Sequence, residues 1–256
     1  MKIAIANQKG GVGKTTVTVT LGKYLAQQGK TVVVVDSDPQ ANATSWLLDG
    51  DTSDAGLFRL LVVGEPLGHV VRNVNGWGMG LLPGGRNARG DDTASAMLYL
   101  AASHKPFDFI SKCLTPLDRV ADYTLIDMPP SKAAGFAEML YACHWVLVPT
   151  QLERFALEGV KLMARTCRQI IQAHGRGPRL LGIVPNMVRM TKEHHAQMGA
   201  LTNHFGSKIW PPIPLATKVA EAAAFGKTMF DHAPGHKATR ALTKIGERVI
   251  ENTGRG

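Results

Sequence analysis

The sequence predicts an α/β fold in which a doubly wound, mostly parallel sheet is flanked by helices. Three observations predict this fold class. Short runs of apolar, mostly β-branched residues recur along the chain, as is typical of strands buried on both faces. Segments with helical periodicity fill the longer gaps between these runs. A glycine-rich turn joins the first run to the first helix, as in a βαβ unit. No internal repeat or linker interrupts the alternation, so we expect one domain over residues 1–256.

The first βαβ unit is the clearest part of the pattern. Residues 3–7 form an apolar run that ends at the glycine turn, and residues 32–35 form a second run that ends at Asp36. Between them, apolar residues recur at four-residue spacing and predict a helix over 14–28, with Gly29 as its C-terminal stop. These apolar residues are Val17, Leu21 and Leu25.

Later segments continue the alternation. Further apolar runs predict strands at 79–82, 124–126, 145–148 and 180–184. Residues 84–92 have the composition of a loop. Apolar residues on one face of 236–251 predict a helix that closes the fold.

Four histidines lie in the second half of the chain without the spacing of a metal site, and we interpret them as loop residues. They are His194, His195, His232 and His236.

The positive charge is concentrated in the second half of the chain. Residues 1–153 contain 13 Lys and Arg against 14 Asp and Glu, whereas residues 154–256 contain 16 against 6. The first part therefore carries a net charge of −1 and the second part +10, which together give the +9 of the whole chain. This asymmetry indicates a surface that binds a polyanion, with solvated helix faces as the alternative.

Several classes of protein are excluded by composition. No apolar stretch approaches the roughly 18 residues of a membrane span. The start of the chain lacks the pattern of a secretory signal, so we expect a cytoplasmic protein. The three cysteines, Cys113, Cys143 and Cys167, are far apart and without CxxC spacing, which argues for buried free thiols rather than a zinc ribbon or a disulfide framework.

The strongest functional signal is the glycine-rich turn after the first strand. It reads Lys9, Gly10, Gly11, Val12, Gly13, Lys14, Thr15, Thr16. Glycines let successive backbone N–H groups point inward at phosphate oxygens, and the following helix adds its positive N-terminal end. In such a loop, Lys14 reaches the β- and γ-phosphates and the hydroxyl of Thr15 binds Mg²⁺.

Carboxylates follow two strands near this turn. Asp127 ends a buried strand, where it can hold a water molecule of Mg²⁺. Asp36 and Asp38 follow the second strand near the same phosphates. A helix cap is the alternative role for Asp36.

The chain resembles the ParA/MinD ATPases from residue 1 to about residue 250, and four segments carry the resemblance most clearly. They are KGGVGKTT at 9–16, VDSDPQAN at 35–42, LIDMPPS at 125–131 and FALEG at 155–159. The first resembles the deviant Walker A loop of that family, the second its Asp-Pro-Gln motif and the third its Walker B segment. Gln8 stands where the usual P-loop pattern has its first glycine, and Lys9 is the extra lysine of the deviant form.

The resemblance implies roles for individual residues. Asp38 orients the attacking water in the slow hydrolysis of ATP, and Asp36 assists at the water molecules of Mg²⁺. Lys9 crosses a homodimer interface to the partner's ATP, where an added cation stabilises the charge of phosphoryl transfer. Asn186 reads adenine, with a loop-capping asparagine as the alternative. Residues Pro212, Ile213 and Pro214 wall the base.

The resemblance also implies partners. ParA proteins bind non-specific double-stranded DNA as ATP dimers and are released when a ParB-like centromere-binding protein stimulates hydrolysis, which fits the basic second half. Leu215 replaces one of two arginines in the matching segment, and Lys218 replaces the other. A stripe at three- or four-residue spacing supplies further cations, with a solvated face as the alternative. It comprises Lys237, Arg240, Lys244 and Arg248.

Three other functions share some of these motifs. A MinD-like membrane switch would need an amphipathic C-terminal helix, and the tail at 251–256 contains no aromatic residue. An iron–sulfur reductase would need a second cysteine suitably near Cys143. A cargo-positioning ATPase shares all the motifs. We therefore expect DNA partitioning by a nucleoid-associated protein, and the sequence does not separate a plasmid from a chromosome.

Overall fold

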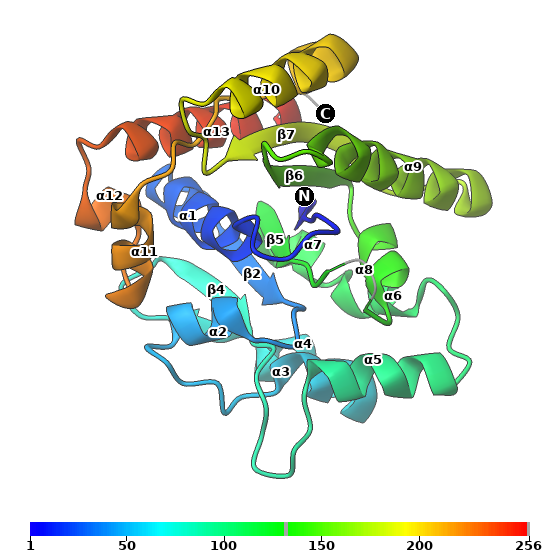
Figure 1. Cartoon of the computed structure of the whole chain (residues 1–256). Coiled ribbons are helices and arrows are strands. Elements are labelled where there is room, and N and C mark those ends of the chain that lie inside the picture. The colour runs from blue at the N-terminus through cyan, green and yellow to red at the C-terminus, as the bar shows by residue number, and fades with distance from the viewer. Residues whose placement is uncertain (131–132, 255–256) are drawn as a thin grey trace.

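The computed structural model describes residues 1–130 and 133–254, and over these residues the chain forms a seven-stranded sheet flanked by helices (Figure 1). The strand order is β3-β4-β2-β5-β1-β6-β7, and every neighbouring pair is parallel except β3 with β4. This arrangement confirms the predicted fold class. Ser131 of the LIDMPPS segment and the last two residues of the tail lie outside the described residues.

Six strands correspond to the predicted apolar runs. They are β1 (Lys2–Ile5), β2 (Val32–Asp36), β4 (Met79–Leu82), β5 (Tyr123–Asp127), β6 (Trp145–Gln151) and β7 (Arg179–Asn186). No apolar run predicts β3 (Arg72–Val74), which pairs antiparallel with β4 at the sheet edge. Two of its three residues are exposed, so it lacks the apolar run that revealed the buried strands.

Helices cover both faces of the sheet. Those that bury side chains against one face are α1 (Lys14–Gln27), α2 (Asn42–Leu47), α11 (Thr217–Ala224), α12 (Met229–His232) and α13 (Lys237–Thr253). Those on the other face are α3 (Gly56–Phe58), η1 (Arg59–Val63), α4 (Leu67–Val70), α5 (Thr93–Ala102), α6 (Phe109–Leu114), α7 (Leu117–Val120), α8 (Phe136–Tyr141), α9 (Ala156–His174) and α10 (Lys192–Phe205). A short turn, η2 (Gly206–Lys208), follows α10.

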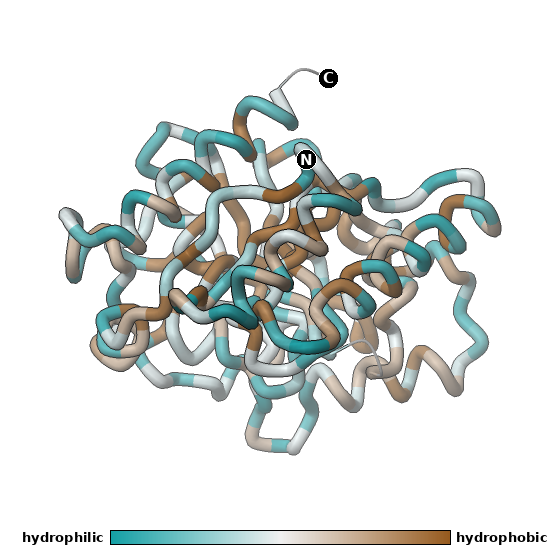
Figure 2. Tube along the Cα trace, turned by 45° about the horizontal axis from the view of Figure 1, so that its top comes forward, coloured by the Kyte–Doolittle hydropathy of each residue, from teal (hydrophilic) through white to brown (hydrophobic). Residues whose placement is uncertain are grey.

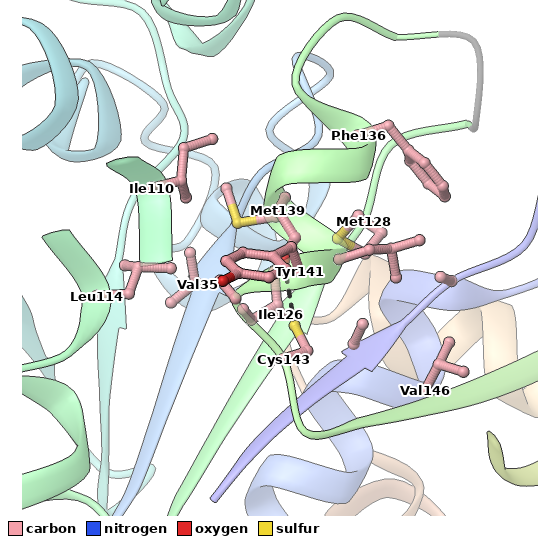
Figure 3. Close-up of a cluster of buried hydrophobic side chains, with 14 of the residues drawn as sticks. Val35, Ile110, Leu114, Ile126, Met128, Phe136, Met139, Tyr141, Cys143 and Val146 are labelled. Carbon is pink, nitrogen blue, oxygen red and sulfur yellow. Dashed lines mark hydrogen bonds between the residues drawn. The ribbon is translucent and has the colours of Figure 1, made fainter. Parts of the chain in front are cut away.

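Apolar side chains fill the space between the sheet and each helical layer. Figure 3 shows part of the core in which Val35 and Ile126 of the sheet lie near Leu114 of α6 and Met139 of α8. In Figure 2 the hydrophobic segments concentrate in the interior of the trace. Such burial on both faces explains why the strands read as continuous apolar runs rather than as alternating patterns.

The chain-end elements agree closely with expectation. The first helix ends at Gln27, and Gly29 has a φ of +74° that allows the chain to leave the helix. The closing helix is α13, and residues 84–92 contain neither helix nor strand.

No helix among the described residues is both long and apolar enough to cross a bilayer. All three cysteines are free; two are buried and Cys113 is half-buried.

The interpretation of the histidines as loop residues is wrong for three of the four and holds for His236. His194 and His195 lie in the first turn of α10, and His232 lies in α12. His236 precedes α13, and its ring accepts a hydrogen bond from the backbone N–H of Ala238. Helix starts bring polar side chains to unpaired N–H groups, and histidine serves that purpose here.

Candidate functional site

The glycine-rich turn lies at the carboxyl end of β1 and leads into α1 (Figure 1). Gly11 and Gly13 have φ values of +72° and +88°, a region that side-chain-bearing residues rarely adopt. A Cβ atom on Gly13 would lie 2.2 Å from Nδ2 of Asn186, so only glycine fits there. The backbone N–H groups of residues 10–13 donate to no acceptor within the described parts of the chain. The turn therefore presents a set of free donors.

Lys14 is a buried cation that forms no direct ion pair with any of the described residues. It is only 7% exposed, and no carboxylate of the described residues lies within 4.0 Å of its ammonium group. It lines a cavity of about 610 Å³, which also contains the side chain of Asp38. The remaining walls are Gly10, Gly11, Gly13, Thr15, Thr16, Pro39, Gln40, Asn42, Pro129, Pro130, Ala133 and Met187. A buried ammonium is costly unless paired, so the site is built to receive an anion.

Asp127 connects the turn to the sheet. Its carboxylate accepts hydrogen bonds from the hydroxyls of Thr15, at 2.6 Å, and Thr18, at 3.2 Å. Burial and the neighbouring Asp36 carboxylate raise the pKa of Asp127 to about 8. Two buried carboxyl groups beside a threonine hydroxyl form a site that a divalent cation would stabilise.

The donor chemistry of this site fits Mg²⁺. Magnesium prefers hard oxygen ligands and retains several waters while bound to substrate phosphates. Thr15 and Asp127 supply such oxygens next to the cavity. Within the described residues, no cluster of three or more His, Cys, Asp or Glu is placed to hold a metal ion by itself.

Asp36 makes the contacts of a helix cap. One of its oxygens accepts hydrogen bonds from both the backbone N–H and the hydroxyl of Thr44, each at 2.7 Å, in the first turn of α2. It is fully buried, and burial raises its pKa to about 6 despite these hydrogen bonds. The structure thus shows Asp36 in the role of a helix cap, the alternative that the sequence leaves open. Asp36 also lies opposite Asp127 in the pairing of β2 with β5.

Lys9 lies at the outer edge of the site. Its ammonium group forms an ion pair with Glu153 and lies 3.4 Å from Oε1 of Gln151. Both charged side chains are about half exposed, at 52% and 55%. Lys9 is therefore held against the end of β6 in this single chain and does not point into the cavity that Lys14 lines.

The residues expected to contact the adenine base differ in their burial and in their neighbours. The side-chain amide of Asn186 is buried and donates to the carbonyl of Val12 at 2.8 Å, so it holds the glycine-rich turn. The side chain of Ile213 is buried in the core and contributes no wall to the cavity. Pro212 is exposed and Pro214 is half-buried. Met187, which follows Asn186, is the residue of this segment that lines the cavity.

Comparison with known proteins agrees with this geometry. A family model described as an AAA domain matches residues 1–177. The chain is 39% identical to the chromosome-partitioning ATPase Soj of Thermus thermophilus over 97% of this chain and 95% of that protein. It is 30% identical to the chromosome partitioning protein ParA of Caulobacter vibrioides over 97% and 93% of the two chains. The chain belongs to the ParA/MinD family of P-loop ATPases.

Solved structures share its fold. A cobyrinic acid a,c-diamide synthase from Mycobacterium smegmatis with a bound ATP analogue and magnesium superposes with a TM-score of 0.81 at 27% identity, over 100% of this chain and 96% of that one. An ATP complex of Cyanothece McdA superposes with a TM-score of 0.84 at 23% identity, over 99% and 96%. The second likeness shows a common fold only.

The basic residues expected to contact DNA in this ParA/MinD family member are mostly on the surface. Lys237, Arg240 and Lys244 are exposed on α13. Arg248 is half-buried, and its guanidinium donates to the carbonyl of Ile209 at 3.2 Å. Lys218 is exposed on α11 but lies 3.7 Å from Glu221, so the two charges partly offset each other at the surface. On α13 the guanidinium of Arg240 also donates to the carbonyl of Gly235, at 2.9 Å. Within the described residues, Lys237 and Lys244 are therefore the two cations of the stripe without a protein partner.

Three residues that take part in the site gave no isolated signal in the sequence. Thr18 lies one turn after Thr15 on α1, so helical spacing was the clue that could have revealed it. Thr44 contacts Asp36 at the end of β2, and Glu153 contacts Lys9 in the turn after β1. The order of the strands in the sheet brings these residues together, and no local sequence pattern predicts the two contacts.

Proposed function

We propose that this chain is a single-domain, ATP-dependent ATPase of the ParA type that partitions DNA in the cytoplasm, on the nucleoid. The observation that carries the proposal is the buried, unpaired Lys14 beneath free backbone N–H groups. A triphosphate supplies the direct ion-pair partner that Lys14 lacks among the described residues. The partitioning relatives, similar over nearly their whole length, support DNA as the cargo.

Residues around the cavity divide the work of hydrolysis. Lys14 and the turn hold the phosphates, and bound Mg²⁺, next to Thr15 and Asp127, neutralises their charge. Asp38 is 8% exposed and lines the cavity, where its carboxylate can orient the attacking water. One carboxylate without a partnering base gives slow hydrolysis, which a ParB-like protein would accelerate.

ATP joins two copies of the chain in this proposal. Lys9 leaves Glu153 and reaches the phosphates of the partner subunit, where its charge stabilises the transition state. Exposed apolar side chains near the same edge support a surface that a second copy covers. Phe155, just after β6, is 70% exposed, and Met190, just after β7, is fully exposed. Such side chains are typical of interface cores.

The ATP dimer binds double-stranded DNA without sequence preference. Lys237, Arg240 and Lys244 place three cations on one exposed helix face, and each phosphate contact releases counterions from DNA. Lys218 contributes less because Glu221 lies 3.7 Å away, and Arg240 and Arg248 each already donate to a backbone carbonyl.

Two measurements test the proposal together. ATP hydrolysis and duplex DNA binding are measured for the wild type, for Asp38→Ala and for the Lys237→Gln/Lys244→Gln double variant. Asp38→Ala should bind ATP and DNA as a dimer without hydrolysis. The double variant should hydrolyse ATP normally and lower the salt slope of DNA binding by about 2. DNA binding without ATP, or a slope unchanged in the double variant, would contradict the assignment.

A further inference from the structure

A second cavity lies at the opposite edge of the sheet from the nucleotide site. It has a volume of about 340 Å³ and is bounded by the amino ends of β1, β6 and β7 together with α6 and α8. Lys2, Ser111, Asp118, Tyr141, His144 and Arg176 contribute to its lining. None of these residues has a role in the hydrolysis proposed above.

Positive charge exceeds negative charge in this cavity. Lys2, Arg176 and Arg179 line it against one carboxylate, that of Asp118. Asp118 pairs with Lys2, whose side chain is only 4% exposed. Over the described parts of the chain, neither arginine has a carboxylate within 4.0 Å. Two guanidinium groups therefore remain uncompensated at one opening.

Arg176 is held in place by neutral groups. Its Nε donates to the hydroxyl of Tyr141 at 2.7 Å, and its Nη2 donates to the hydroxyl of Ser111 at 3.0 Å. The guanidinium also stacks 4.3 Å from the centre of the Tyr141 ring, and Figure 3 places that ring within the core cluster. A fixed guanidinium loses little entropy when it binds a carboxylate or phosphate.

The neighbouring polar groups are also donors. The hydroxyls of Tyr141 and Ser111 accept from Arg176, and their own protons have no acceptor among the described residues. The Nδ1 atom of His144 accepts from the backbone N–H of Lys2 at 2.9 Å. Burial, followed by the charge of Lys2, lowers the pKa of His144, so the neutral ring carries its proton on Nε2 and offers a further donor.

We propose that this cavity binds a small molecule through a phosphate or carboxylate group on Arg176. Uncompensated guanidinium groups and hydroxyl donors recognise such oxygens, and Asp118 is the lone carboxylate in the lining. The volume of the cavity is about ten times the volume that one molecule occupies in liquid water, so the cavity admits a group larger than a bare ion.

The test uses full-length protein saturated with magnesium and a non-hydrolysable ATP analogue, which fills the site at the glycine-rich turn. Thermal unfolding is followed during titration with inorganic phosphate or acetate, against chloride at matched ionic strength. Specific binding raises the unfolding temperature. Arg176→Gln should weaken binding at least tenfold, and Tyr141→Phe, which keeps the ring, severalfold. Arg165→Gln, on the exposed face of α9, is the matched control and should bind as the wild type does.

Three results would overturn the proposal. The first is wild-type protein that responds to phosphate and acetate no more than to chloride. The second is binding unchanged in Arg176→Gln. The third is a loss of duplex DNA binding in Arg176→Gln with phosphate binding intact, which would assign the arginine to a nucleic-acid surface. Because ATP hydrolysis is measured separately, failure here leaves the proposed ATPase function standing.

Discussion

The ion pair between Lys9 and Glu153 makes a quantitative prediction about dimer formation. In the single chain this pair holds the lysine that, in the proposed function, reaches across to the partner's ATP. Each protomer must break the pair before its Lys9 can cross. Replacing Glu153 by Gln removes that cost, so Glu153→Gln should strengthen ATP-dependent dimerisation.

The size of the effect follows from exposure. Both side chains are about half exposed, and such surface pairs contribute about 0.2–1 kcal/mol each. Two protomers together give about 0.4–2 kcal/mol, which corresponds to a dimer dissociation constant lowered by about twofold to thirtyfold. Salt screens exposed charges, so the difference should shrink at high ionic strength.

Sedimentation equilibrium with saturating ATP, in an Asp38→Ala background that blocks hydrolysis, measures the dissociation constant. Glu158→Gln is the matched control, because Glu158 is an exposed acid on α9 whose nearest cation, Lys161, is 4.0 Å away. It should leave dimerisation unchanged. If Glu153→Gln weakens the dimer at low salt, Glu153 stabilises the interface itself, and the account of a restrained Lys9 is refuted.

Three further predictions concern the nucleotide site and the core. Lys14→Ala should abolish ATP binding in calorimetry while the fold persists; retained affinity would reject the phosphate role of the turn. In protein free of magnesium and nucleotide, folded Asp127 holds its proton up to a pKa of about 8, whereas the unfolded value is about 4. The free energy of unfolding should therefore fall as pH rises through that window, and Asp127→Asn should flatten the fall in thermal melts. Gly246→Ala places a Cβ atom 2.1 Å from the ring of Tyr24 and should cost about 1–3 kcal/mol in urea unfolding, whereas Gly199→Ala, with open space around it, should be neutral or stabilising.

Local chemistry explains what could be predicted about the nucleotide site. Glycines followed by Lys14 and Thr15 specify a phosphate-binding turn whatever surrounds them, because backbone geometry and charge act over a few residues. Asp38 and Asp127 follow apolar runs, and parallel strands bring their carboxyl ends to one edge. The expectation that these residues gather needed only the strand pattern.

Contacts between residues of different strands and loops could not be predicted from the pattern of strands along the chain. The side-chain amide of Asn186 donates to the carbonyl of Val12 because β7 ends beside the glycine-rich turn, and no spacing within one segment predicts that contact. The burial of the Ile213 side chain in the core likewise depends on packing between segments far apart in the sequence. The edge strand β3 has too few buried residues to leave an apolar signature.

The sequence alone determined the six strands that read as apolar runs, the first and last helices, the phosphate-binding turn and the excess of positive charge in the second half, since each depends on composition or on spacing within one segment. Only the tertiary structure decided that Glu153 restrains Lys9, that Asp36 caps α2 and that Arg176 stands uncompensated beside Tyr141. Those contacts join residues from 8 to 144 positions apart, and the distance between such residues depends on how strands are ordered and helices packed. That order results from the burial of the whole apolar surface and has no local signature.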